Sequence, residues 1–171
     1  MRRGIIPLLA VLAAGCGTQA PPVAISSGQV ELTPVTVTDL EKDIASYKGK
    51  VVYIDAWFLG CPPCRDQFPH TVQLHRKYAA DGLVVMSVDI KSDEWKESRE
   101  KVLKFLTEKG ATFPNYIFQD RPDKVGIWMD RHGVSATPAV VAFNRDGRRV
   151  PVPNFRTNEE EEAFVKKLLG E

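Results

Sequence analysis

The hydrophobic pattern alternates between strand-like runs and helical stretches along most of the chain. Three runs, 51–58, 83–90 and 139–143, are rich in β-branched and other apolar residues and are typical of buried central strands. Segments between them carry apolar residues at the three- and four-residue spacing of amphipathic helices. This alternation predicts parallel strands joined by right-handed crossover helices. The sequence therefore indicates an α/β domain.

Weaker signals add elements around this core. An edge strand is expected over 30–37, because Pro34 lacks the N–H group that a central strand needs. Asp39 is expected to cap a short helix that ends near Tyr47. The remaining predicted elements are a helix from about 62 to 78 kinked at Pro69, a helix capped by Ser92 or Asp93 and running to Lys109, a strand over 115–119, a helix over 123–131, an antiparallel strand over 149–153 and a last helix capped by Thr157.

The N-terminus has the pattern of an export signal rather than of a folded element. Arg2 and Arg3 precede an apolar run over 5–14, which is too short to span a bilayer and fits a secretory signal peptide. The stretch Leu12-Ala13-Ala14-Gly15-Cys16 resembles the lipobox of bacterial lipoproteins, with Ala13 where that motif most often has leucine. The resemblance implies cleavage before Cys16 and lipidation of its thiol. An ordinary signal peptide cut nearby is the alternative.

These signals divide the chain into three parts. We expect a signal peptide over 1–15, a lipidated flexible tether over 16–29 and one domain over 30–171. The length suits a single domain, and the net charge of +1 gives no electrostatic footprint for nucleic acid. Of the three cysteines, lipidation of Cys16 would leave one pair, Cys61 and Cys64.

That pair, Cys61-Pro62-Pro63-Cys64, stands between a predicted strand and a predicted helix. The thiolate is the reactive form of cysteine, and the partial positive charge of a helix N-terminus lowers a thiol pKa. Cys61 is therefore placed as the nucleophile, and Cys64 as the thiol that resolves a mixed disulfide. Pro62 and Pro63 suit the first helical turn, where N–H groups have no intrahelical partner.

Other uses of two cysteines must be weighed. A zinc site would need a second ligand pair, which the sequence lacks, and a purely structural disulfide would not explain the prolines. A Cu(I) carrier that uses Cys61 and Cys64 as soft ligands is the main rival. A peroxidase is weaker still, because no Thr-x-x motif precedes Cys61. His70, His75 and His132 are given no role, and the acidic run 159–162 is explained by the helix dipole.

The segment 52–65, Val-Tyr-Ile-Asp-Ala-Trp-Phe-Leu-Gly-Cys-Pro-Pro-Cys-Arg, resembles the active-site strand and helix of the thioredoxin superfamily. Its Pro-Pro pair and the signal peptide are similar to those of the membrane-tethered TlpA/ResA branch. The resemblance covers about 39–169. It implies a three-layer thioredoxin-like fold: a central mixed sheet flanked by helices, with an N-terminal strand extension and a helical insertion.

A second motif, Gly133-Val-Ser-Ala-Thr-Pro-Ala-Val-Val141, is similar to the loop that precedes the family's cis-proline. The resemblance implies a cis Thr137-Pro138 bond facing the dithiol, where the Thr137 backbone could pair with a substrate strand. It also places Pro62, Pro63 and Trp57 at the substrate-binding surface. The alternative for Trp57 is a core position, since a large aromatic residue on a buried strand is more often part of the core.

Asp55 matches the buried acid of thioredoxin, which is usually regarded as the proton acceptor for the resolving cysteine. Among apolar neighbours a carboxyl is desolvated and its pKa rises, which makes it a better base near neutral pH. Two departures from the family stand out: residues 83–90 contain no lysine to pair with Asp55, and Gly60 replaces a tryptophan. The alternative is a solvated Asp55 at a strand end.

The resemblance implies an extracytoplasmic thiol-disulfide oxidoreductase, tethered to a membrane through lipidated Cys16. Its expected partners are cysteine-containing exported proteins as substrates and a membrane or extracytoplasmic thiol donor for recycling. The branch favours reduction, for example of apocytochrome c or of copper-site cysteines. We expect no cofactor, no bound metal and no nucleic acid, and we expect a monomer.

Overall fold

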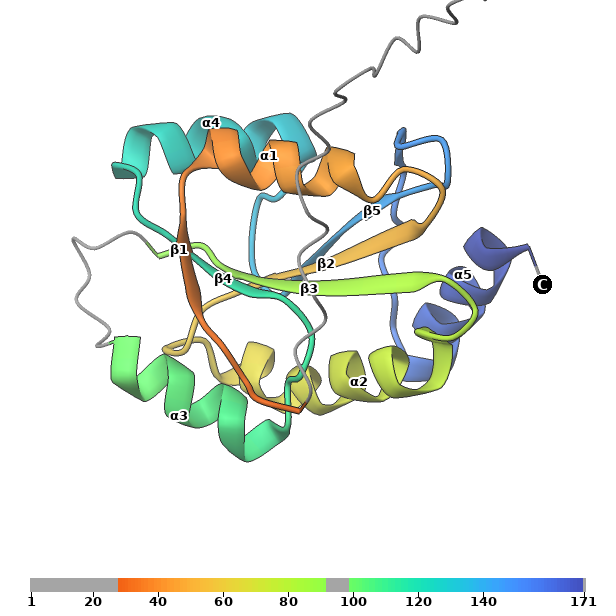
Figure 1. Ribbon diagram of the computed structural model, residues 1–171, viewed down its shortest axis with the longest axis horizontal. Coiled ribbons are helices and arrows are strands. Elements are labelled where there is room, and N and C mark those ends of the chain that lie inside the picture. The colour runs from red at the N-terminus through yellow and green to blue at the C-terminus, as the bar shows by residue number, and fades with distance from the viewer. Residues whose placement is uncertain (1–27, 92–98, 171) are drawn as a thin grey trace, which may run out of the picture.

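A six-stranded sheet separates two layers of helices in the computed structural model, which describes residues 28–91 and 99–170 (Figure 1). The strands lie in the order β1-β4-β3-β2-β5-β6. They are β1 (Thr33–Val35), β2 (Val51–Trp57), β3 (Leu83–Asp89), β4 (Asn115–Phe118), β5 (Ala139–Phe143) and β6 (Arg149–Val150). Pairs among β1, β4, β3 and β2 are parallel, whereas β5 is antiparallel to β2 and β6 to β5. The predicted mixed sheet is confirmed.

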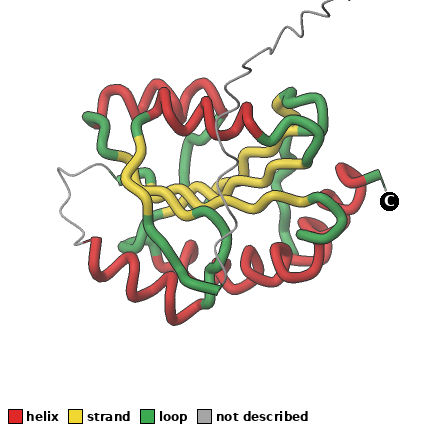
Figure 2. Tube along the Cα trace, viewed as in Figure 1, coloured by secondary structure: helices red, strands yellow, loops and turns green. Residues whose placement is uncertain are grey.

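The helices cover both faces of this sheet (Figure 2). They are α1 (Val37–Ser46), α2 (Pro62–Tyr78), α3 (Arg99–Lys109), α4 (Pro122–His132) and α5 (Asn158–Leu169). One hydrophobic core joins the sheet to α2, α3 and α5, and the second joins it to α1 and α4. The two helix layers and the sheet are the three layers that the sequence predicted.

Strand β2 is buried along its whole length and supplies both cores. Side chains alternate between the faces of a strand. Tyr53 and Trp57 thus pack into the core of α2, α3 and α5, whereas Ile54 lies in the core of α1 and α4. Asp55 has the same parity as Tyr53 and Trp57. Its carboxyl therefore enters the layer that contains α2.

Several predicted boundaries need correction. The cap of α1 was predicted at Asp39 and is Thr36: the Thr36 hydroxyl accepts the Asp39 N–H at 3.1 Å and donates to the Asp39 carboxylate at 2.7 Å. The helix therefore starts three residues earlier, at Val37. Strands β1 and β6 are shorter than predicted, since only Thr33–Val35 and Arg149–Val150 are paired in the sheet.

Other boundaries are confirmed. Helix α2 continues through Pro69 to Tyr78, and Thr157 caps α5 by accepting the Glu160 N–H. The predicted caps Ser92 and Asp93, and the expected signal peptide over 1–15, lie outside the described residues. Within 28–91 and 99–170, no helix combines the length and hydrophobicity needed to cross a membrane.

Candidate active site

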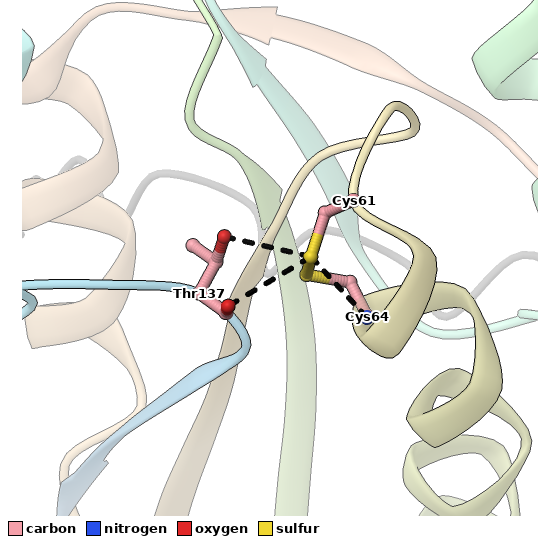
Figure 3. The surroundings of a disulfide bond; sticks show 3 residues. All are labelled: Cys61, Cys64 and Thr137. Carbon is pink, nitrogen blue, oxygen red and sulfur yellow. Dashed lines mark hydrogen bonds between the residues drawn. A yellow bond between two sulfur atoms is a disulfide. The ribbon is translucent and has the colours of Figure 1, made fainter.

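Cys61 and Cys64 form a disulfide at the N-terminus of α2, with their Cα atoms 5.3 Å apart (Figure 3). Cys61 is the N-cap of the helix, and the Cys64 N–H donates a 3.3 Å hydrogen bond to Cys61 Sγ. Pro62 and Pro63 occupy the first helical positions, as predicted, and no acidic residue lies in this first turn. A thiolate on Cys61 would therefore point toward the positive end of α2, which stabilises it.

The two cysteines differ slightly in exposure to solvent. Cys61 keeps 5 % of its surface exposed and Cys64 keeps 1 %. Pro62 and Pro63 are exposed beside them. An incoming disulfide can thus approach Cys61 more readily than Cys64, in agreement with the roles expected from their order in the sequence.

The loop before β5 faces this disulfide. Strand β5 runs antiparallel to β2, with Ala139 opposite Ala56, so the loop reaches the end of β2 where the dithiol begins. The Thr137-Pro138 peptide bond is cis, as predicted. Thr137 Oγ1 donates to Cys61 Sγ at 3.6 Å and the Thr137 carbonyl oxygen lies 3.8 Å from the same sulfur (Figure 3).

Trp57 does not lie on the substrate-facing surface that the family resemblance implied. Its side chain has no exposed area and packs against Phe68 and Phe105, with ring centroids 4.8 and 5.2 Å away. Side chains alternate between the two faces of β2, and Trp57 lies on the face that packs against α2 and α3, so its indole enters that core. We therefore assign Trp57 to the support of the dithiol turn rather than to substrate contact.

Asp55 is buried below α2, with 3 % of its surface exposed. Thr71 Oγ1 donates a 2.7 Å hydrogen bond to Asp55 Oδ2. Burial raises the pKa of Asp55 from 3.8 to about 7; the hydrogen bond from Thr71 opposes this rise, and the charge of Glu161 adds to it. The predicted desolvated carboxyl is confirmed, and the solvated alternative is wrong. A base with a pKa near 7 suits proton transfer at neutral pH.

The helical repeat relates Asp55 to the dithiol. Thr71 follows Cys64 by two turns of α2 and lies on the same face of the helix. The acid therefore contacts the helix face that carries the resolving cysteine. Neither neighbouring strand offers a cation, since the residues opposite Asp55 are Ser87 on β3 and Val140 on β5.

Glu161 is a buried acid that the sequence analysis did not identify. Its assignment to the helix dipole alone was wrong, because only 1 % of its surface is exposed. Gln67 Nε2 donates to Glu161 Oε2 at 2.6 Å, and the Tyr53 hydroxyl donates to Glu161 Oε1. One signal was available: Glu161 has the helical phase of the inward-facing Val165.

A cavity of about 630 Å³ lies beside the cis-proline loop. Asp55 and Glu161 both line it, as do Gln67 and Pro138. The two acids come from β2 and α5, which are far apart in the sequence, so only the packed fold brings them together.

The histidines are packed side chains. His132 contacts Glu41 at 2.7 Å in the opposite helix layer, and His75 stacks edge-on with Phe113. His70 lies 3.6 Å from Glu161. Among the described residues, no three His, Cys, Asp or Glu side chains are grouped as metal ligands, so a Cu(I) carrier would depend on Cys61 and Cys64 alone.

Comparison with known proteins shows the family to which this chain belongs. The family model described as Redoxin matches residues 17–165. This chain belongs to the Redoxin family. With its Cys61–Cys64 pair, it is a ResA/TlpA-like thiol-disulfide oxidoreductase of the thioredoxin superfamily, as the sequence motifs predicted.

Individual relatives agree with this assignment. Thiol-disulfide oxidoreductase ResA of Bacillus thuringiensis (strain Al Hakam) is 29% identical over 136 residues, which cover 77% of this chain and 73% of the relative. ResA of Geobacillus kaustophilus is 26% identical, with 88% and 82% covered. A structure from Chlorobium tepidum, described as a thiol:disulfide interchange protein DsbE, is 30% identical with a TM-score of 0.59, covering 74% of this chain and 85% of its own.

Proposed function

We propose that this oxidoreductase is exported, anchored to a membrane through lipidated Cys16, and reduces disulfides of other exported proteins. Cysteine pairs of apocytochrome c or of copper sites are the substrates we favour. A membrane or extracytoplasmic thiol donor would return the Cys61–Cys64 disulfide to the dithiol. The lipobox-like sequence before Cys16 and the relationship to ResA support the proposed location and direction.

One observation carries the redox part of the proposal: Cys61 Sγ lies at the N-terminus of α2 with the Thr137 backbone carbonyl 3.8 Å away. This carbonyl belongs to a half-buried residue that stands between exposed Ala136 and exposed Pro138. An extended substrate segment could hydrogen-bond to the loop and bring its disulfide to Cys61.

The reaction is an exchange of disulfide bonds. The Cys61 thiolate attacks one sulfur of the substrate disulfide, so a Cys61–substrate bond forms and the substrate bond breaks. The Cys64 thiol then gives its proton to Asp55 and attacks Cys61 Sγ. The Cys61–Cys64 bond forms, the substrate leaves as a dithiol after protonation, and the enzyme is left oxidised. Two electrons thus pass from the enzyme to the substrate.

Reduction of insulin by the purified protein, recycled with dithiothreitol, tests this assignment. Cys61→Ser should abolish turnover above the dithiothreitol background, because the attacking thiolate is lost. Pre-reduced Cys64→Ser, mixed with insulin after the dithiothreitol has been removed, should retain attack but lack resolution, and should accumulate a mixed disulfide visible on a non-reducing gel. Cys16→Ser is the matched control and should turn over at the wild-type rate. Turnover by Cys61→Ser would contradict the assignment of the nucleophile.

The location is tested separately by growing cells with a labelled fatty acid. The wild-type protein should incorporate the label and sediment with membranes, whereas Cys16→Ser should do neither. A soluble, unlabelled wild-type protein would refute the lipid anchor and leave the redox chemistry unaffected.

A further inference from the structure

The Glu161 carboxylate is held in place by polar contacts from two other elements. The Tyr53 hydroxyl of β2 donates to one oxygen, and Gln67 Nε2 of α2 donates to the other at 2.6 Å. His70 Nε2, buried and without a hydrogen-bond partner, lies 3.6 Å from the same carboxylate. Donors directed at a carboxylate stabilise its ionised form. Burial raises the pKa of Tyr53 well above 10, so this hydroxyl remains a neutral donor.

This carboxylate shares a cavity with Asp55. Of the residues that line the cavity, Asp55 and Glu161 are the two with ionisable carboxyls, and no basic side chain lines it. A charge on Glu161 is thus uncompensated on the side that faces Asp55.

The neighbouring elements supply few other charges. On α2, Thr71 gives Asp55 a neutral hydrogen bond, and His70 contacts Glu161 rather than Asp55. The other titratable groups near the two carboxyls are Tyr53 on β2 and, on α2, His70 and the reduced Cys64. On α5, Glu159 interacts electrostatically with His70. The residues opposite Asp55 on β3 and β5, Ser87 and Val140, do not titrate.

We propose that Glu161 is a positioning residue for proton transfer, whose fixed charge makes the Asp55 carboxylate a stronger base toward the resolving thiol. This role rests on the proposed function, in which Asp55 receives the proton of Cys64. Glu161 itself touches neither sulfur nor substrate. It acts through Asp55, because like charges in one buried cavity favour protonation of one partner.

In the resolving step, the Cys64 S–H bond breaks and its proton moves to an Asp55 oxygen. The Cys64 thiolate attacks Cys61 Sγ, the Cys61–Cys64 bond forms, and the substrate sulfur leaves with its electron pair. With Glu161 ionised, Asp55 holds the transferred proton more tightly. The proton is later lost to water in the cavity that both acids line.

Replacement of Glu161 by glutamine tests the proposal without depending on turnover. Titration of the Asp55 carboxyl by ¹³C NMR in the oxidised protein gives its midpoint, with the resonance assigned by its loss in Asp55→Asn. Glu161→Gln keeps the size of the side chain and removes its charge. We expect the Asp55 midpoint to fall by about half a pH unit or more. Glu160→Gln, an exposed change of the same kind on α5, should leave it unchanged.

The pH dependence of insulin reduction provides the functional readout. Because Asp55 must be ionised to accept a proton, the acid limb of the resolution rate should move to lower pH in Glu161→Gln. The rate at the plateau should fall, since the base is weaker. Glu161→Asp retains the charge and should return the midpoint toward the wild-type value.

Unfolding curves establish that each variant is folded, and Tyr53→Phe serves as a second probe if Glu161→Gln is not. Loss of the Tyr53 hydroxyl removes a hydrogen bond that stabilises the ionised Glu161 carboxylate, so the Asp55 midpoint should also fall. An unchanged Asp55 midpoint in whichever variant folds would overturn the proposal. Absence of insulin reduction by the wild-type protein would instead count against the proposed function, and the NMR titration would still stand.

Discussion

Replacement of Asp55 by asparagine should make the fold more stable at alkaline pH. Asp55 is buried, and its pKa is raised from 3.8 to about 7, mainly by burial. Between these two values the folded protein keeps a proton that the unfolded chain has lost, so stability falls as pH rises. Each pH unit in this window corresponds to about 1.4 kcal/mol. The full penalty above pH 7 is therefore about 4 kcal/mol.

Asparagine removes this penalty because it does not ionise. Its side-chain oxygen can still accept the hydrogen bond from Thr71, and its amide can be hydrated from the cavity that Asp55 lines. The gain should approach 4 kcal/mol at about pH 8 and vanish below about pH 3, where the wild-type carboxyl is protonated in both states. For a chain of this size, such a gain raises Tm by roughly 10 °C.

Thermal and urea unfolding of the oxidised protein, followed by circular dichroism across this pH range, measures the effect. Asp66→Asn, the same substitution at an exposed position of α2, is the matched control and should show no pH-dependent gain. A stability difference between Asp55→Asn and wild type that does not change with pH would refute the reasoning. The same variant should resolve mixed disulfides more slowly, because the proton acceptor is lost.

Two further results are expected. Thr71→Val removes the hydrogen bond that lowers the pKa of Asp55, so the Asp55 midpoint in the ¹³C NMR titration should rise above about 7; a fall would contradict the assigned donor. The reduction potential of the Cys61–Cys64 pair, measured in glutathione or dithiothreitol buffers, should lie closer to thioredoxin's value of about −270 mV than to DsbA's of about −120 mV. The donors to Cys61 Sγ are the neutral Cys64 N–H and Thr137 hydroxyl, which stabilise a thiolate only moderately; a potential near DsbA's would reject reduction as the working direction.

Local patterns were sufficient to predict most of the fold. The apolar runs that became β2, β3 and β5 have the composition of buried strands, and the Cys-Pro-Pro-Cys turn marks the start of α2. The predicted start of α1 was wrong because two nearby residues could serve as its N-cap. Thr36 and Asp39 both have capping side chains, and the choice depends on backbone geometry that the sequence does not contain.

The candidate site divides in the same way. Cys61, Cys64 and the Thr137-Pro138 bond belong to short motifs whose chemistry can be recognised before folding. For Trp57 the sequence left a surface position and a core position open, because the strand pattern does not say whether its last residue lies at the surface or beneath another helix. Asp55 was recognised as a base, but the hydrogen bond from Thr71 depends on how α2 lies across β2.

The reactive dithiol and the order of the elements can be read from the chain before it folds, because adjacent residues set the turn, the helix start and the strand alternation. The second charge near Asp55 follows only from the tertiary structure. Glu161 is 106 positions away in the chain and belongs to an acidic run at a helix start. Only the packing of α5 against β2 and α2 buries its carboxylate beside the cavity of Asp55, where the low dielectric constant of the protein interior makes one charge felt by the other.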